Sequence, residues 1–288
     1  MTAMFRAAAP TLAGPAAAVP GPGLFDRLAA SAAPVLDRPA ASPEPRLADG
    51  LAASALTDRL AAIAWPALAA ELDAQGAAVI EQLLSPAACA ELAAMYARDD
   101  AFRSRVVMAR HGFGSGEYKY FADPLPPPIA ALRAQLYPRL APIANRWAAQ
   151  LGGDVRYPDD HASFLARCHA AGQIRPTPLL LRYGPGDYNC LHQDLYGEHV
   201  FPLQVAVLLS APGRDFTGGE FVITEQRPRM QSRPLVVPLG QGDAVVFAVR
   251  YRPVEGTRGP YRVNLRHGVS RIRSGQRFTA GVIFHDAP

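Results

Sequence analysis

The sequence has few cysteines, a single lysine and no long apolar run, and these shortages limit the class of protein. Its cysteines are Cys89, Cys168 and Cys190, and their odd number and lack of a CxxC pair fit a reducing cytoplasm. No apolar run reaches the ~18 residues of a membrane helix. Prolines interrupt the alanine-rich N-terminus, which argues against a secretory signal. We therefore expect a cytoplasmic protein with no membrane partner.

Basic charge comes almost entirely from arginine, and it is concentrated in the C-terminal part. The chain has 288 residues and a net charge of +4, and Lys119 is its only lysine. From Arg175 to the end, 14 arginines stand against 9 acidic residues. Such a balance suits a polyanionic partner, although a genome that favours alanine and arginine would produce the same usage.

The composition divides the chain in two. Residues 1–56 are dominated by Ala, Pro and Gly, which predicts a low-complexity and disordered tail because proline-broken alanine runs bury little surface. Residues 57–288 are long enough for one catalytic domain with a substantial core.

The domain begins with helical patterns and continues with strands. We expect a strand at 77–84 and helices at 57–72, 87–96 and 129–152, the last interrupted near Pro138 and Pro142. After Thr177, short apolar runs bounded by Gly and Pro predict strands at 179–183, 203–209, 219–224, 235–237, 244–249, 263–269 and 277–284. Helices followed by such strands predict an α+β protein with a β-barrel or jelly-roll core.

The most informative motif is His192-Gln193-Asp194, which is followed much later by His267. If the motif lies on a strand, His192 and Asp194 point to the same face and can reach one metal ion. Two histidines and one carboxylate, with open coordination positions, are the ligands of non-heme Fe(II). Zinc hydrolases use the same ligand types, but the sequence contains no HExxH motif.

A second feature near the C-terminus favours the iron site. Arg277 follows His267 by ten residues, and Thr279 shares its face of the predicted strand. A guanidinium there can bind the distal carboxylate of 2-oxoglutarate in a bidentate salt bridge, and the threonine hydroxyl can add a hydrogen bond.

These motifs, taken in order, resemble the Fe(II)/2-oxoglutarate-dependent dioxygenases. The resemblance covers roughly residues 60–288 and includes the run 181–188 (Leu-Arg-Tyr-Gly-Pro-Gly-Asp-Tyr), the Gly-Gly-Glu-Phe run at 218–221 and the Gly-Asp-Ala-Val-Val-Phe run at 242–247. It implies a double-stranded β-helix, or jelly roll, with Fe(II), 2-oxoglutarate and O2 as cofactors. His192, Asp194 and His267 are then the catalytic metal ligands, and Arg277, Thr279 and Tyr183 bind 2-oxoglutarate.

Three further runs resemble a prokaryotic AlkB-like oxygenase family assigned to oxidative demethylation of damaged DNA. They are Phe-Gly-Ser-Gly-Glu-Tyr-Lys-Tyr-Phe at 113–121, Arg-Pro-Thr-Pro-Leu-Leu-Leu at 175–181 and Glu-Gln-Arg-Pro-Arg-Met-Gln-Ser-Arg at 225–233. The resemblance implies single-stranded or damaged DNA, or RNA, as partner. The chain departs from AlkB at Leu181, where AlkB has Asn, and the paired C-terminal arginines of AlkB are missing. The spacing from His267 to Arg277 looks more like the prolyl hydroxylases.

The segment 102–121 is the expected substrate lid. It combines basic and aromatic residues around three glycines, and we expect Arg103, Arg105, Tyr118 and Tyr120 to bind substrate. Basic groups can hold phosphates while aromatic rings stack on a flipped base. Equally, a glycine-rich aromatic loop can simply cover a barrel.

Two alternatives to a nucleic-acid demethylase remain open. The prolyl-hydroxylase-like spacing would suit a hydroxylase of a protein side chain or of a small metabolite. A non-catalytic barrel would require a metal triad that binds no iron.

Overall fold

The computed structural model describes residues 47–288, with side chains from residue 55 onward. Most of the predicted tail, residues 1–46, lies outside the described residues. Helix α2 (Leu47–Ala62) runs through the predicted boundary after residue 56, and its Leu56 and Leu60 are buried in the main core. The described chain therefore contributes to the fold on both sides of that boundary.

The helices lie mainly in the N-terminal half. They are α3 (Trp65–Gln75), α4 (Pro86–Ala94), α5 (Pro127–Gln150) and α6 (His161–Ala170), with short 3-10 turns η1 (Met95–Ala97), η2 (Asp99–Ala101) and η3 (Met108–Arg110). Two predictions were wrong here. The helix expected at 57–72 is divided before Trp65, since Pro66 fits the first turn of a new helix. The break expected near Pro138 and Pro142 is absent, because α5 contains both prolines.

A seven-stranded antiparallel sheet forms one layer. Its order is β1-β11-β7-β15-β5-β4-β2, with β1 (Ala77–Ile80), β11 (Ala244–Ala248), β7 (Leu203–Leu208), β15 (Arg277–Val282), β5 (Leu179–Tyr183), β4 (Glu117–Phe121) and β2 (Phe102–Val107). β7 and β11 are buried throughout, as expected for strands in the centre of a layered fold.

A six-stranded antiparallel sheet forms the second layer. It contains β10 (Arg233–Val237), β9 (Phe221–Gln226), β13 (Tyr261–Val269), β6 (Tyr188–His192) and β3 (Gly114–Ser115) in that order, and β12 (Tyr251–Val254) pairs with β13. A separate pair joins β8 (Phe216–Gly218) to β14 (Ile272–Gly275). Seven predicted strands after Thr177 are present, with ends shifted by at most two residues.

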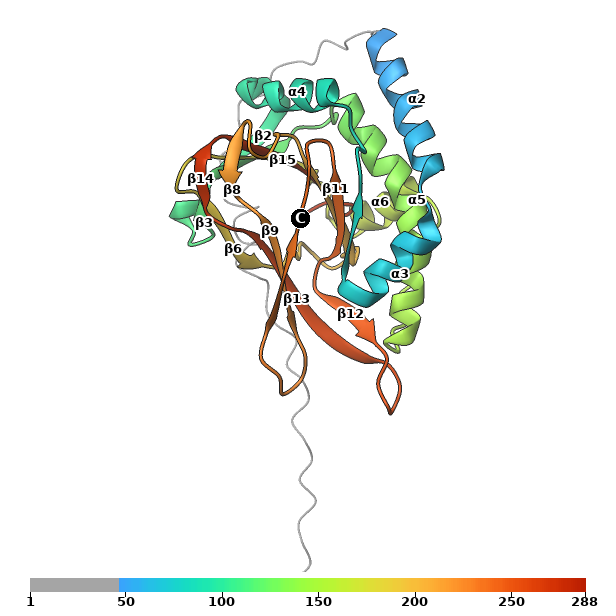
Figure 1. Ribbon diagram of the computed structural model, residues 1–288. Coiled ribbons are helices and arrows are strands. Elements are labelled where there is room, and N and C mark those ends of the chain that lie inside the picture. Colours follow the sequence, from blue (N-terminus) through green and yellow to red (C-terminus); the bar gives the residue numbers. More distant parts are fainter. Residues whose placement is uncertain (1–46) are drawn as a thin grey trace, which may run out of the picture.

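The two sheets face each other around a pocket. Its walls come from β4, β5, β7, β11 and β15 of one sheet and from β6, β9 and β13 of the other. In Figure 1 the helices α2, α3 and α5 gather on one side of these sheets. This arrangement confirms the predicted α+β fold with a jelly-roll core and helices packed on it. Within residues 47–288, no helix is both long and apolar enough to cross a membrane.

Candidate metal centre and co-substrate pocket

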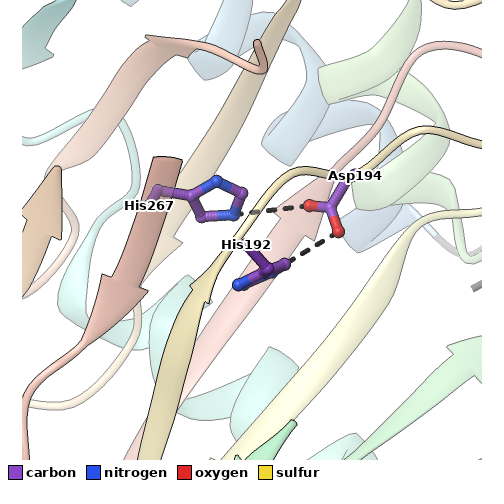
Figure 2. Close-up of side chains that lie close together, drawn as sticks. All are labelled: His192, Asp194 and His267. Carbon is purple, nitrogen blue, oxygen red and sulfur yellow. Dashed lines mark ion pairs between the residues drawn. The ribbon is translucent and has the colours of Figure 1, made fainter. Parts of the chain in front are cut away.

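The three predicted metal ligands come together between the sheets (Figure 2). His192 is the last residue of β6, and its register partner on β13 is His267. Asp194 lies beyond the end of β6, so the expectation that the whole motif is on a strand was wrong. The carboxylate still reaches the histidines from the segment that follows the strand.

Their donor atoms are close enough to bind a single ion. Asp194 Oδ1 lies 3.5 Å from His192 Nε2, and Asp194 Oδ2 lies 3.4 Å from His267 Nε2. The donor atoms of all three residues lie within 4.8 Å of one another, and among residues with described side chains no fourth His, Cys, Asp or Glu joins the group. Two nitrogens and one oxygen with no further protein ligand fit Fe(II) with open positions, whereas a structural zinc site has four protein ligands.

Neighbouring groups orient His192 and keep Asp194 ionised, as the binding of a metal ion requires. His192 Nδ1 donates to the carbonyl oxygen of Cys190 at 2.7 Å, which leaves the lone pair of Nε2 for the ion. Burial acts to raise the pKa of Asp194, but the two neighbouring histidines outweigh it and hold that pKa well below its usual range. Asp194 is therefore a carboxylate at neutral pH. All three cysteines are free thiols, and none of them belongs to the ligand group.

Arg277 lies on the same pocket and carries an unbalanced charge. Its side chain is 1% exposed, and none of the described carboxylates forms an ion pair with it. Its guanidinium carbon lies 5.7 Å from the centre of the Tyr183 ring and 5.8 Å from that of Phe216. Burial lowers the pKa of Arg277 to about 10. A buried guanidinium without a carboxylate is costly unless a ligand provides one.

The other two predicted co-substrate residues are beside Arg277. Thr279 Oγ1 accepts a hydrogen bond from Arg277 Nη1 at 2.5 Å. Tyr183 is the register partner of Arg277 on β5, and its hydroxyl is buried. All three residues line the pocket that contains the triad. The pocket thus presents a cation and two hydroxyl groups to a small acidic molecule.

The turn at Gly218-Gly219 packs closely against the side chain of Arg277. Both glycines have positive φ, at 74° and 67°, a backbone conformation that glycine adopts without strain. A Cβ at Gly219 would lie 2.9 Å from Arg277 Cδ and 2.3 Å from Ile272 Cδ1. The close approach of the turn to the arginine therefore depends on glycine at this position.

The expected lid at 102–121 is instead largely part of the sheets, and this corrects the prediction. β2 and β4 are paired strands of the seven-stranded sheet. Arg105 lies on the outer face of that sheet, in an ion pair with Glu117, and lines a separate surface hollow. Arg105 is the register partner of Lys119, whose side chain lies on the face opposite to Tyr118 and Tyr120, so Arg105 cannot reach a substrate in the pocket. The register of β2 shifts between Phe102 and Ser104, so this alternation does not extend to Arg103.

The other three predicted substrate residues lie on the inner side. Tyr118 lines the pocket, and the ring of Tyr120 packs edge-on against it with centroids 5.3 Å apart. Arg103 lies behind Tyr120, with its guanidinium carbon 4.5 Å from the ring centre. Tyr118 is therefore the one of the four that faces a ligand directly.

Sequence reasoning missed Tyr196. This buried tyrosine lines the pocket, and its hydroxyl donates to Asp194 Oδ1 at 3.1 Å. The available signal was its position two residues after a predicted metal ligand.

A jelly roll that carries two histidines, one aspartate and a buried unpaired arginine defines a non-heme iron oxygenase that uses a 2-oxo acid. Residues 116–287 match the model of a family described as an oxygenase catalysing oxidative methylation of damaged DNA. The chain belongs to this oxygenase family and is an Fe(II)/2-oxoglutarate oxygenase, with Fe(II), 2-oxoglutarate and O2 as cofactors. The predicted superfamily and enzyme class are confirmed.

Several known proteins are similar to this chain. Two uncharacterized proteins of Mycobacterium tuberculosis, from strains CDC 1551 and H37Rv, are each 54% identical over 167 residues, which is 58% of this chain and 72% of the relative. An oxidoreductase of the 2OG-Fe(II) oxygenase family from Burkholderia pseudomallei is 16% identical with a TM-score of 0.47, covering 78% of this chain and 94% of that one. A prolyl hydroxylase from Trichoplax adhaerens, solved with a peptide fragment of hypoxia inducible factor, is 13% identical with a TM-score of 0.49, covering 81% and 93%.

Proposed function

We propose that this oxygenase removes methyl groups from alkylated nucleic-acid bases by oxidation. The observation that carries the substrate class is the family match, whose description names damaged DNA. The excess of arginine after Arg175 adds mild support, because it suits a polyanionic partner. DNA, single-stranded or damaged, is the proposed partner, and RNA offers the same chemistry.

Each site residue has a role in this proposal. His192, Asp194 and His267 hold Fe(II) through Nε2 of each histidine and one carboxylate oxygen. Arg277 binds the distal carboxylate of 2-oxoglutarate, assisted by the hydroxyls of Thr279 and Tyr183. A salt bridge to that carboxylate would neutralise the one buried guanidinium in the pocket that lacks a described counter-ion.

The chemistry fits an apolar and enclosed site. When bound, iron with 2-oxoglutarate and O2 supplies oxidative decarboxylation to succinate and CO2, coupled to insertion of oxygen into a substrate C–H bond. Phe113, Tyr118, Leu181 and Val269 line the pocket and exclude water from it. Hydroxylation of an N-methyl group leads to release of formaldehyde and the unmodified base.

Placement of the basic residues removes one argument for nucleic acid. The predicted basic lid does not exist in that form, since Arg105 and Lys119 point to the outer face of the sheet and pair with acidic residues. Substrate recognition in this proposal rests on Tyr118, with Arg103 and Tyr120 behind it. An aromatic wall suits a planar base.

Mass spectrometry on methylated oligonucleotides tests the proposal. Single strands bearing N1-methyladenine or N3-methylcytosine would be incubated with the full chain, Fe(II), 2-oxoglutarate, ascorbate and O2. We expect each oligonucleotide to lose one CH2 unit, with formaldehyde released, and expect no change with Asp194→Ala. Unmodified masses alongside continued succinate formation would contradict the nucleic-acid substrate while leaving an active oxygenase.

That second outcome would favour a hydroxylase of a protein side chain or a small metabolite. The observation in its favour is the ten-residue interval from His267 to Arg277, which resembles the prolyl hydroxylases. Such an enzyme would add one oxygen atom to a peptide or metabolite and release no formaldehyde.

A further inference from the structure

We propose that Tyr196 is a positioning residue that limits Asp194 to one metal-binding oxygen, and that Tyr120 and Arg103 orient it. The inference rests on the metal site of the proposed function. It concerns which of the two carboxylate oxygens binds the ion and which positions then stay open.

The two oxygens of Asp194 have different surroundings. In Figure 2 the two histidines face different oxygens of the carboxylate. Oδ1 also accepts a hydrogen bond from the Tyr196 hydroxyl at 3.1 Å, whereas the contact of Oδ2 is with His267 Nε2 at 3.4 Å, a nitrogen that would itself bind the metal. A hydrogen bond to one oxygen draws electron density from it, so Oδ2 becomes the stronger donor to a cation.

The direction of this hydrogen bond is fixed by chemistry. An ionised carboxylate can only accept, so the single proton of the Tyr196 hydroxyl must point to Asp194. Tyr120 then donates to the Tyr196 oxygen, and the two hydroxyl oxygens lie 3.1 Å apart. Both hydroxyl protons in this hydrogen-bond series, from Tyr120 to Tyr196 and from Tyr196 to Asp194, thereby point toward the metal ligand.

Tyr120 is held in turn by Arg103. The guanidinium lies over the Tyr120 ring, and Arg103 Nε donates to the carbonyl oxygen of Pro176 at 2.9 Å. A cation over a phenol ring fixes its orientation and favours the phenol as a hydrogen-bond donor. This gives Arg103 a function at the site although it does not line the pocket.

The backbone of Tyr196 is fixed as firmly as its hydroxyl. Gln173 Nε2 donates to the carbonyl oxygens of Tyr196 at 3.2 Å and of Asp286 at 2.6 Å. Gln173 Oε1 accepts from the backbone nitrogen of His199 at 2.7 Å. These bonds restrain the backbone at Tyr196 and thereby hold its hydroxyl against Oδ1 of the carboxylate.

The consequence is an open coordination position. A carboxylate that binds through both oxygens uses two positions on the ion, and one that binds through a single oxygen uses one. With two histidines, binding through a single oxygen would leave positions on the ion open for the co-substrate and O2. Loss of the Tyr196 hydroxyl should therefore lower the affinity for the metal and also change the number of Asp194 oxygens that bind it.

The experiment compares Tyr196→Phe and Tyr120→Phe with Tyr137→Phe as a matched control. Tyr137 is also fully buried, but its hydroxyl has no hydrogen-bond partner among the described side chains and it lies outside the pocket. The full chain would be titrated with Co(II) by calorimetry, and the visible spectrum of the Co(II)-loaded protein would be recorded. Thermal unfolding of each metal-free variant identifies any variant that is misfolded.

We expect Tyr196→Phe to weaken Co(II) binding about 10- to 100-fold, the usual effect of removing a group that orients a ligand. Its Co(II) spectrum should change intensity, because a second carboxylate oxygen joins the ion. Tyr120→Phe should show a smaller loss in the same direction, and Tyr137→Phe should match the wild type.

Wild-type affinity and spectrum in a folded Tyr196→Phe variant would overturn the inference alone. Failure of the wild-type chain to bind Co(II) would instead contradict the metal site and, with it, the proposed function. If the Tyr196→Phe variant is too unstable to bind Co(II), the test rests on Tyr120→Phe. Wild-type Co(II) affinity in Tyr120→Phe would then overturn the proposed hydrogen-bond series from Tyr120 to Asp194.

Discussion

Arg277→Met should abolish 2-oxoglutarate binding without destabilising the ligand-free protein. Burial lowers the pKa of Arg277 from 12.5 to about 10. At about 1.4 kcal/mol per pKa unit, this corresponds to roughly 3 kcal/mol of destabilisation by the charged group at neutral pH. Because the folded-state pKa is depressed, this cost is fully present below pH 10 and is relieved only above it.

The contacts that Arg277 makes offset this cost. It lies near the rings of Tyr183 and Phe216 and donates to Thr279. Two cation–π contacts and one hydrogen bond contribute about 1 kcal/mol each. The two sides nearly cancel, so the methionine variant should differ from the wild type by less than about 1 kcal/mol in free energy of unfolding.

Arg133 provides a matched control. It is 3% exposed, but it pairs with the buried Asp286 at 2.6 Å and donates to the carbonyl oxygen of Ile283. Removing one partner of a buried ion pair typically costs ~3–5 kcal/mol. Arg133→Met should therefore be strongly destabilised where Arg277→Met is not.

Urea unfolding measures both effects, with Co(II) in place of oxidisable Fe(II). At 2-oxoglutarate concentrations about 100 times its dissociation constant, the wild type should gain about 2.7 kcal/mol of stability. Arg277→Met should gain none. The reasoning would be refuted if Arg277→Met lost as much stability as Arg133→Met and still responded to 2-oxoglutarate.

Three further predictions concern neighbouring groups. Gly219→Ala should raise the KM for 2-oxoglutarate in steady-state assays, because its Cβ would meet Arg277 Cδ at 2.9 Å in a backbone with positive φ; an unchanged KM would contradict this contact. Arg105→Ala should leave KM and kcat unchanged, since that side chain lies on the outer face with Glu117, and a large loss of activity would mean that the outer face takes part in turnover. Co(II) affinity should fall as the pH is lowered through the pKa of His192: burial opposes its charged form, but Asp194 outweighs burial and raises this pKa above its usual value, so protons compete for Nε2. A Co(II) affinity that stays constant in a titration across this range would count against His192 as a ligand.

The metal ligands could be predicted from the sequence because their chemistry is local. His192 and Asp194 stand two apart, and any extended backbone brings them to one side. Arg277 could be predicted for the same reason, since Thr279 shares its face of β15. The shift of Asp194 beyond the end of β6 did not matter, because its carboxylate oxygens still lie 3.5 Å from His192 Nε2 and 3.4 Å from His267 Nε2.

The error at 102–121 has a physical cause. Three glycines before Glu117 suggested a loop, yet Tyr118 and Tyr120 alternate with Glu117 and Lys119 as in a strand. That alternation puts the two tyrosine rings on the pocket side of the sheet and the charges on its outer face. Period-two alternation was a better guide there than the glycine content.

The role of Tyr196 depended on contacts that the sequence does not specify, whereas the break before Trp65 had a signal in Pro66 that the helical spacing of the apolar residues outweighed. Tyr196 gains its role from Tyr120 and Gln173, which are distant in the chain and meet it only in the folded state. The continuous course of α5 through Pro138 likewise depends on packing, since ten of its residues are buried.

Succinate formation from 2-oxoglutarate tests the central claim most directly, namely that the triad and Arg277 form a working oxygenase site. The full chain would be supplied with Fe(II), 2-oxoglutarate and O2, and succinate would be quantified by NMR for the wild type, Asp194→Ala and Arg277→Met. We predict succinate from the wild type alone, with O2 consumed in equal amount. Succinate formed by both variants at the wild-type rate, or by none of the three proteins, would contradict the assignment of this site.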